Sequence, residues 1–119
     1  MREVAQRISV IEDERVVPRG SATTYWFVRV HDGWVRAGNL PEARVETVEP
    51  GPSVIWQQRV DLELPRGTLL MQVRSAPHVV AKSPLDYLSA GTRRKRRTVR
   101  TVHRVTARGL VTENTPRKT

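Results

Sequence analysis

The chain of 119 residues contains no cysteine, so neither a disulfide framework nor a thiolate metal site can form. Its apolar runs are too short for a membrane-spanning helix. The first seven residues include acidic and amide side chains where a signal peptide would be apolar. We therefore expect a cytoplasmic protein that does not associate with membranes.

Acidic residues are almost missing from the last quarter of the sequence. Residues 92–119 contain 10 Lys and Arg against one acid, Glu113, whereas residues 1–91 contain 11 of each sign. The formal net charge of +9 therefore belongs entirely to the C-terminal segment. Because such a cluster repels itself, a polyanion is the partner that stabilises it most readily.

Aromatic residues make up only 5% of the chain, and none lies inside the basic segment 93–108. Nucleic-acid-binding modules often interleave aromatic and basic residues so that bases can stack. Tyr25 and Trp34, near the ends of a predicted hairpin, are the candidates for stacking. With no aromatic side chain in the basic segment, we expect recognition of the phosphate backbone rather than of bases.

Val and Thr recur throughout the sequence, and Pro and Gly separate short apolar runs. This pattern predicts a mostly β protein, a single small antiparallel barrel or sandwich of about six to eight strands. We assign residues 1–112 to this domain, with the basic segment on or beside its last strand. Residues 113–119 are expected to form a flexible tail.

Two hairpins are predicted. Residues 23–30 and 34–36 flank Asp32-Gly33, a dipeptide suited to tight turns, and Trp26, Val28 and Val30 share the face expected to be buried. Residues 53–64 and 68–74 flank Pro65-Arg66-Gly67, with positions 58, 60, 62 and 64 on the buried face. Residues 43–48 are predicted to form a further strand.

Residues 33–40 read Gly-Trp-Val-Arg-Ala-Gly-Asn-Leu. This segment resembles the Gly-Trp-Val…Leu ending of SH3-type barrels, where it stands late in the domain. The acidic loop and paired aromatics that bind proline-rich ligands in that family have no counterpart here. The resemblance favours a small barrel and transfers no binding residue to this chain.

The N-terminal segment and the region after residue 80 are less regular. Ile8–Ile11 and Val16–Val17 favour strands, with Glu12-Asp13-Glu14 interpreted as a turn, although Val4, Ile8 and Ile11 also fit a helical stripe. Ser83 as N-cap, Pro84 in the first turn and Gly91 as the stop predict one short helix near residues 84–89.

The basic segment is predicted to lead into a last strand, residues 98–106, because six of these nine residues are β-branched. Even positions would present arginines outward and odd positions from Val99 would face inward. The side chains expected to contact phosphates are Arg93, Arg94, Lys95, Arg96, Arg97, Arg100, Arg104 and Arg108. The alternative is that these charges protect a sheet edge from pairing with other chains.

The composition and motifs therefore predict a non-enzymatic nucleic-acid-binding module that needs no cofactor. The alternative is a subunit of a larger assembly, such as a virion or ribonucleoprotein component or a small inhibitor, whose basic strip docks on an acidic protein surface. A small ribonuclease would require His103 to point outward beside Arg100 and Arg104. No His or carboxylate spacing indicates a metal site.

Overall fold

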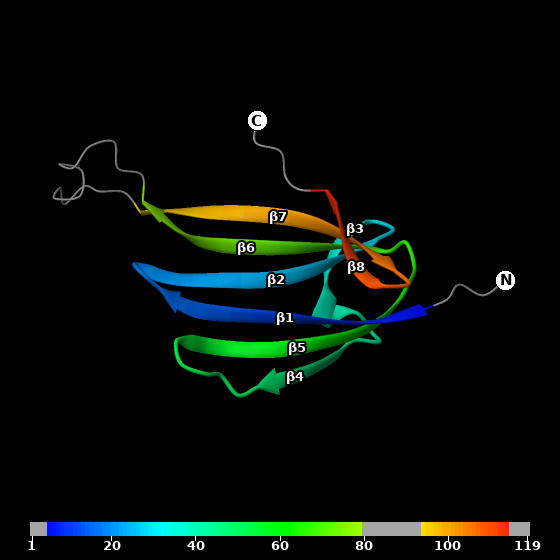
Figure 1. Ribbon diagram of the computed structural model, residues 1–119, viewed down its shortest axis with the longest axis horizontal. Coiled ribbons are helices and arrows are strands. Elements are labelled where there is room, and N and C mark those ends of the chain that lie inside the picture. The colour runs from blue at the N-terminus through cyan, green and yellow to red at the C-terminus, as the bar shows by residue number, and fades with distance from the viewer. Residues whose placement is uncertain (1–4, 80–93, 115–119) are drawn as a thin grey trace.

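The computed structural model describes residues 5–79 and 94–114 of the chain. Within these ranges, eight antiparallel strands form one curled sheet, and the only helical element is a 3-10 turn (Figure 1). The turn, η1, spans Ala37–Asn39. The strands are β1 (Ala5–Val17), β2 (Gly20–Val30), β3 (Gly33–Arg36), β4 (Arg44–Val48), β5 (Val54–Pro65), β6 (Leu69–Val79), β7 (Arg94–Thr106) and β8 (Gly109–Asn114).

The prediction of a mostly β, antiparallel architecture is confirmed, and the strands predicted at 23–30, 34–36, 43–48 and 98–106 are all present. The short helix predicted near residues 84–89 lies outside the described residues. β8 extends to Asn114, two residues into the segment that the sequence assigns to a tail. The described part of the chain contains no helix of the length and apolarity needed to cross a bilayer.

The second predicted hairpin is wrong in its pairing. β5 and β6 are strands, but β1 and β2 lie between them in the order β4-β5-β1-β2-β6-β7-β8, and β3 pairs with β2. β5 instead pairs with β1 from Ala5 to Arg15, which sets Ile8 opposite Leu62 and Val10 opposite Val60. This long register with matched apolar rows outweighs the local turn at Pro65, because sheet stability comes from cross-strand side-chain pairs.

The interpretation of Glu12-Asp13-Glu14 as a turn is also wrong. These residues lie inside β1, a continuous strand of 13 residues, and Glu12 and Asp13 are buried. A strand can carry a buried carboxylate only where donors from other strands satisfy it. Those donors come from distant parts of the chain and are described below.

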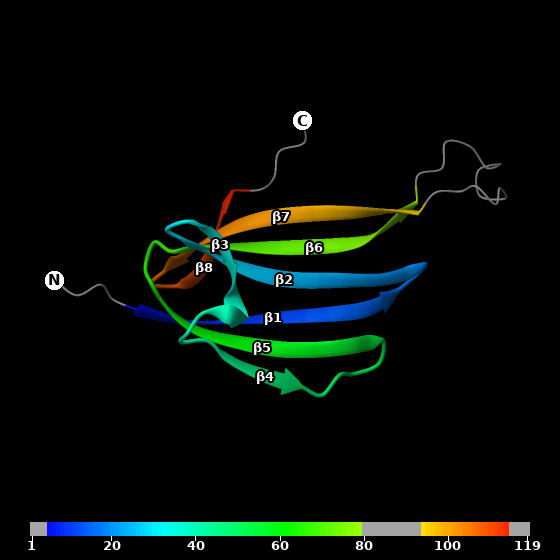
Figure 2. The same cartoon turned by 180° about the vertical axis from the view of Figure 1, so that it is seen from behind.

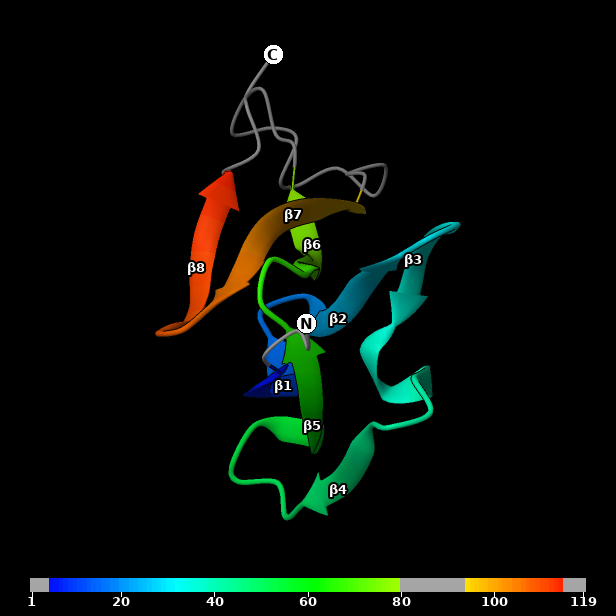
Figure 3. The same ribbon diagram turned by 90° about the vertical axis from the view of Figure 1, so that its right-hand side faces the viewer.

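Along one of its edges, β2 pairs with two different strands at different positions. It pairs with β1 over Gly20–Thr24 and with β3 over Phe27–Val30, while β6 occupies its other edge. β1 and β2 therefore separate beyond the Asp13–Thr24 pair, and the sheet curls. β3 and β8 lie on opposite sides of the central strands (Figure 3).

The curl brings side chains from both faces of the strands into one core. Leu40, Ala43 and Leu110 pack against its margin. The buried members are Ile8, Val10, Trp26, Val28, Ala37, Val60, Leu62, Leu64, Leu70 and Val105. This set confirms the predicted buried faces of residues 26–28 and 60–64. Away from η1 and β8, the long strands continue as a single layer, seen in Figure 2 from the side of β3 and η1.

Candidate nucleic-acid interface

The basic residues divide between the two faces of β7. Side chains alternate along a strand, so Arg96, Arg100 and Arg104 share one face and Arg97 lies on the other. The odd face is buried only at its C-terminal end: Val105 is 1% exposed, whereas Val99, also predicted to face inward, is 38% exposed. Arg94 and Lys95 begin β7, Arg108 lies in the turn before β8, and Arg93 is outside the described residues.

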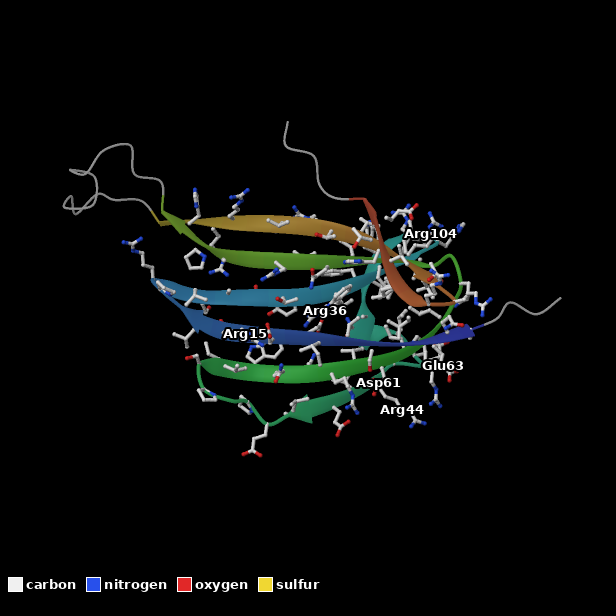
Figure 4. All side chains as sticks on the ribbon, viewed as in Figure 1. Arg15, Arg36, Arg44, Asp61, Glu63 and Arg104 are labelled. Atoms are coloured by element: carbon white, nitrogen blue, oxygen red, sulfur yellow. The ribbon has the colours of Figure 1, made fainter. Side chains whose placement is uncertain are left out.

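Arg104 differs from the other arginines on its face because it forms a two-pronged ion pair with Glu113 of β8 (Figure 4). Its Nε and Nη2 donate to the two carboxylate oxygens at 3.0 and 2.7 Å. These hydrogen bonds raise the pKa of Arg104 and lower the pKa of Glu113. Its charge is thus already compensated within the molecule.

Arg96 is held in place by neutral acceptors. Its Nε donates to Ser75 Oγ at 3.0 Å, and its Nη2 donates to the carbonyl oxygens of Ser75 and Ser21, both at 3.2 Å. Arg100 lies four residues further along β7 and is exposed. Among the described residues neither guanidinium has an acidic partner, so both keep a full positive charge available to an anion.

The sheet register places an aromatic side chain in the same row as Arg100. Arg100 pairs with Val73 of β6, and Val73 pairs with Tyr25 of β2. Directly paired residues point to the same face, so these three side chains line one surface. The next row runs from Thr98 through Ser75 and Thr23. Arg100 and Tyr25, which are 75 positions apart in sequence, therefore share one face of the sheet with one strand between them.

A second aromatic residue, Trp56 of β5, completes this surface. It pairs with Glu14, which pairs with Thr23, so all three lie on the face of Tyr25. The rings of Tyr25 and Trp56 are 5.9 Å apart and inclined at 36°. We call this surface the open face. It comprises Glu14, Thr23, Tyr25, Trp56, Val73, Ser75, Arg96, Thr98 and Arg100.

Sequence reasoning missed Trp56 because its partners lie on strands that are remote in the chain. The available signal was alternation, since Trp56 shares the even face of residues 54–64 with Gln58. Trp34, the other predicted stacking residue, pairs with Arg29 of β2, so it lies on the same side of the sheet as Tyr25 but two alternate residues further along, and the guanidinium of Arg29 is 5.7 Å from its ring. Both Tyr25 and Trp34 are half-buried.

Glu12 is the centre of a buried polar cluster beside the open face. Its Oε2 accepts from the backbone N–H of Trp26 at 2.9 Å and from Arg36 Nε at 2.9 Å. Its Oε1 accepts from Arg36 Nη2 at 3.0 Å and from Gln58 Nε2 at 2.9 Å. Burial raises the pKa of this carboxyl, but the hydrogen bonds from Arg36, Trp26 and Gln58 outweigh it and the net pKa is lowered.

Arg36 links this cluster to the aromatic residues. Its guanidinium carbon lies 4.1 Å from the centre of the Tyr25 ring, within range of a cation–π contact. The hydrogen bonds from Arg36 to Glu12 raise its own pKa. Figure 4 shows Arg36 where β1 and β2 separate. Glu12 therefore fixes Arg36, and Arg36 fixes one side of the Tyr25 ring.

His103 lies on the face of β7 opposite to Arg100 and Arg104. Its ring is 5.3 Å from that of Trp26, and its Nδ1 is 3.4 Å from Thr112 Oγ1. Its Nε2 is buried and has no hydrogen-bond partner in the described part of the chain. The described residues thus lack the outward His103 beside two arginines that a ribonuclease of the kind considered above requires.

A polar hollow of about 550 Å³ lies between β1, β4 and β5 (Figure 4). Three arginines there face three acids, and Ser9 Oγ donates to Asp61, which lowers the pKa of that carboxyl. The balanced charge gives the hollow no preference for a polyanion. Its charged members are Arg7, Glu42, Arg44, Arg59, Asp61 and Glu63. The described residues contain no group of three His, Asp or Glu side chains suited to a metal ion.

No protein-family model matches the chain, and no curated protein and no solved structure shows significant similarity to it.

Proposed function

We propose that this chain is a non-enzymatic nucleic-acid-binding module that contacts its ligand through the open face, with those basic side chains of segment 93–108 that lie on the same side of the sheet. The observation that carries the proposal is the row Arg100–Val73–Tyr25, which puts a guanidinium without an acidic partner in the described part of the chain on the same face as an aromatic ring. Arginine is suited to phosphate because its planar donors match two phosphate oxygens. The sequence alone gave no reason to expect an aromatic side chain next to the basic segment.

A second argument concerns the alternative, a subunit that docks on an acidic protein surface. Assembly surfaces usually present a contiguous apolar patch. The large apolar side chains exposed in the described residues are instead scattered over five strands. They are Ile11, Val16, Val45, Ile55, Val99 and Val111. Their distribution favours binding of a polyanion over docking through an apolar interface.

The test compares two double variants that remove the same charge from opposite faces. Arg96→Ser with Arg100→Ser alters the open face on β7, whereas Arg74→Ser with Arg97→Ser alters the opposite face on β6 and β7. Fluorescence anisotropy should be measured at about 150 mM salt on labelled single-stranded and duplex oligonucleotides. We expect the first variant to lose at least tenfold in affinity and the second to stay within about threefold of wild type.

Equal losses in both variants would reduce the interaction to general electrostatic attraction and contradict the proposal. If wild type binds neither oligonucleotide at this salt concentration, the proposal fails. The alternative hypothesis, docking of the basic strip on an acidic protein surface, would then be tested.

A further inference from the structure

We infer that the open face takes single-stranded nucleic acid, with phosphates along β7 and bases directed across the sheet toward Tyr25 and Trp56. This inference rests on the proposed function and names its class of ligand. Only unpaired bases can stack on aromatic side chains, because a duplex hides the faces of its bases. A phosphate-binding surface without aromatic residues would not distinguish the two forms.

Positive charge on the open face lies on β7, and negative charge lies on β1. This difference determines on which side of the sheet the backbone of a bound nucleic acid lies. Arg96 and Arg100 lie on β7 and have no acidic partner among residues 5–79 and 94–114, whereas the carboxylate of Glu14 lies on β1 beside Trp56. A phosphate is attracted to the first edge and repelled from the second. The backbone of the ligand therefore runs along β7, and the bases point toward β2 and β5.

The spacing of the strands allows this arrangement. β7 and β2 are separated by one strand, β6, which puts their axes about 10 Å apart. Arg96 and Arg100 are four residues apart on the same face, a separation of about 13 Å along the strand. The two arginines and the ring thus form a triangle across which one extended strand can lie, with the arginines at phosphates that are not adjacent.

The aromatic rings are held before any ligand arrives. Trp56 Nε1 donates to Glu14 Oε1 at 3.0 Å, and Glu14 Oε2 accepts from Ser21 Oγ at 2.6 Å. Arg96 donates to the backbone carbonyl of the same Ser21, so the bonds connect β5, β1, β2 and β7. Tyr25 is held separately by Arg36. A preformed stacking surface loses little conformational entropy on binding.

The experiment uses three probes with the full chain at about 150 mM salt: dT15, rU15 and a 15-base-pair duplex. Wild type should bind one or both single strands more tightly than the duplex, and dT15 against rU15 separates a DNA ligand from an RNA ligand. Tyr25→Leu and Trp56→Leu should each weaken single-strand binding by about 5- to 100-fold, the loss of one stacked base. Both variants should bind the duplex within twofold of wild type.

Trp34→Leu is the matched control, because its partner Arg29 lies four residues, about 13 Å, beyond Tyr25 along β2, away from the row of Arg100, and we expect no change on any probe. A second measurement, of tryptophan fluorescence, uses conservative Trp→Phe substitutions. The single strand should quench tryptophan fluorescence of wild type and of Trp34→Phe, and Trp56→Phe should bind with nearly unchanged affinity but lose most of the quenching.

Duplex binding equal to or tighter than single-strand binding, with no effect of Tyr25→Leu or Trp56→Leu, would overturn the inference and leave the proposed function standing. Absence of binding to all three probes would instead remove the proposed function itself. The two failures are therefore distinguishable in one set of titrations.

Discussion

Glu12 stands where β1 and β2 separate, and it replaces the backbone partner that the sheet lacks at this point. The N–H of Trp26 faces the gap between β1 and β3, and the Glu12 carboxylate accepts it. In return, the Trp26 indole donates to the carbonyl oxygen of Ile11 at 3.1 Å. Each strand thus supplies a side chain to the backbone of the other, and the sheet can divide without leaving buried polar groups unsatisfied.

Glu12→Gln is expected to lower the free energy of unfolding by about 2–4 kcal/mol. The amide keeps the shape of the side chain, but its NH2 group faces a donor, and Arg36 loses a buried counter-charge. Arg36 is 35% exposed, so water screens part of the loss. Urea unfolding followed by tryptophan fluorescence measures the change.

The control for this prediction is Glu63→Gln, which removes an exposed carboxylate whose partner Arg7 is at 3.4 Å. An exposed ion pair contributes little, so its unfolding free energy should stay within about 0.5 kcal/mol of wild type. An equally small effect of Glu12→Gln would contradict the structural role given to Glu12.

At the scale of elements, strands with regular alternation were predictable and their partners were not. β2 and β7 are recognisable by their β-branched and aromatic residues, β3 by the Asp32-Gly33 turn before it, and β5 by the alternation of apolar and polar residues over positions 58–64. Glu12 interrupts this pattern in β1, and its donors Arg36 and Gln58 lie 24 and 46 residues away. A local interpretation of three consecutive acids therefore gave a turn instead of a buried strand.

The candidate site was predictable only in its basic half. The density of arginines in the C-terminal segment indicated phosphate contact directly, and Tyr25 was named as a stacking candidate. The position of Tyr25 on the same face as Arg100 depends on the order of β2, β6 and β7, which arises from competition among strands for partners. The same competition inserts β1 and β2 between β5 and β6, so Trp56 could not be assigned to this face beforehand.

His103 of β7 lies next to Trp26 of β2 and Thr112 of β8, and its partly buried ring makes the stability of the protein depend on pH. Burial lowers the pKa of His103 below its usual 6.5. The unfolded chain therefore binds a proton more readily than the folded chain, so stability is full above about pH 6.5 and falls as pH drops from there toward the folded pKa. The slope for one proton is at most about 1.4 kcal/mol per pH unit.

We expect wild type to lose stability in urea unfolding between pH 7.5 and 5.5, and His103→Phe to lose markedly less. Phe keeps a ring beside Trp26 and removes the buried nitrogen. Because the pKa of Glu12 is lowered, its contribution to stability is full above about pH 4.5 and is lost only below that value, outside this window. His31→Gln, which removes an exposed histidine, serves as the control. Parallel profiles for wild type and His103→Phe would contradict the assignment.

At the scale of the whole molecule, the salt dependence of the binding affinity distinguishes direct phosphate contacts from the general effect of the net charge. The chain carries a formal charge of +9, and each double variant, Arg96→Ser with Arg100→Ser or Arg74→Ser with Arg97→Ser, lowers it by two to +7. Counterion release follows the phosphates actually contacted, not the total charge. About five contacts predict a log–log slope near −3.5 on a single strand and near −4.5 on a duplex.

The open-face variant should therefore reduce the magnitude of the single-strand slope by about 1.4, while the variant of the opposite face leaves it unchanged. Affinity measured on dT15 between about 50 and 300 mM salt gives both slopes. Arg104 provides a further check: because Glu113 already compensates its charge, Arg104→Ser should change the slope by less than one full contact. Equal slopes for the two double variants would mean that the arginines attract nucleic acid only as part of an overall positive field.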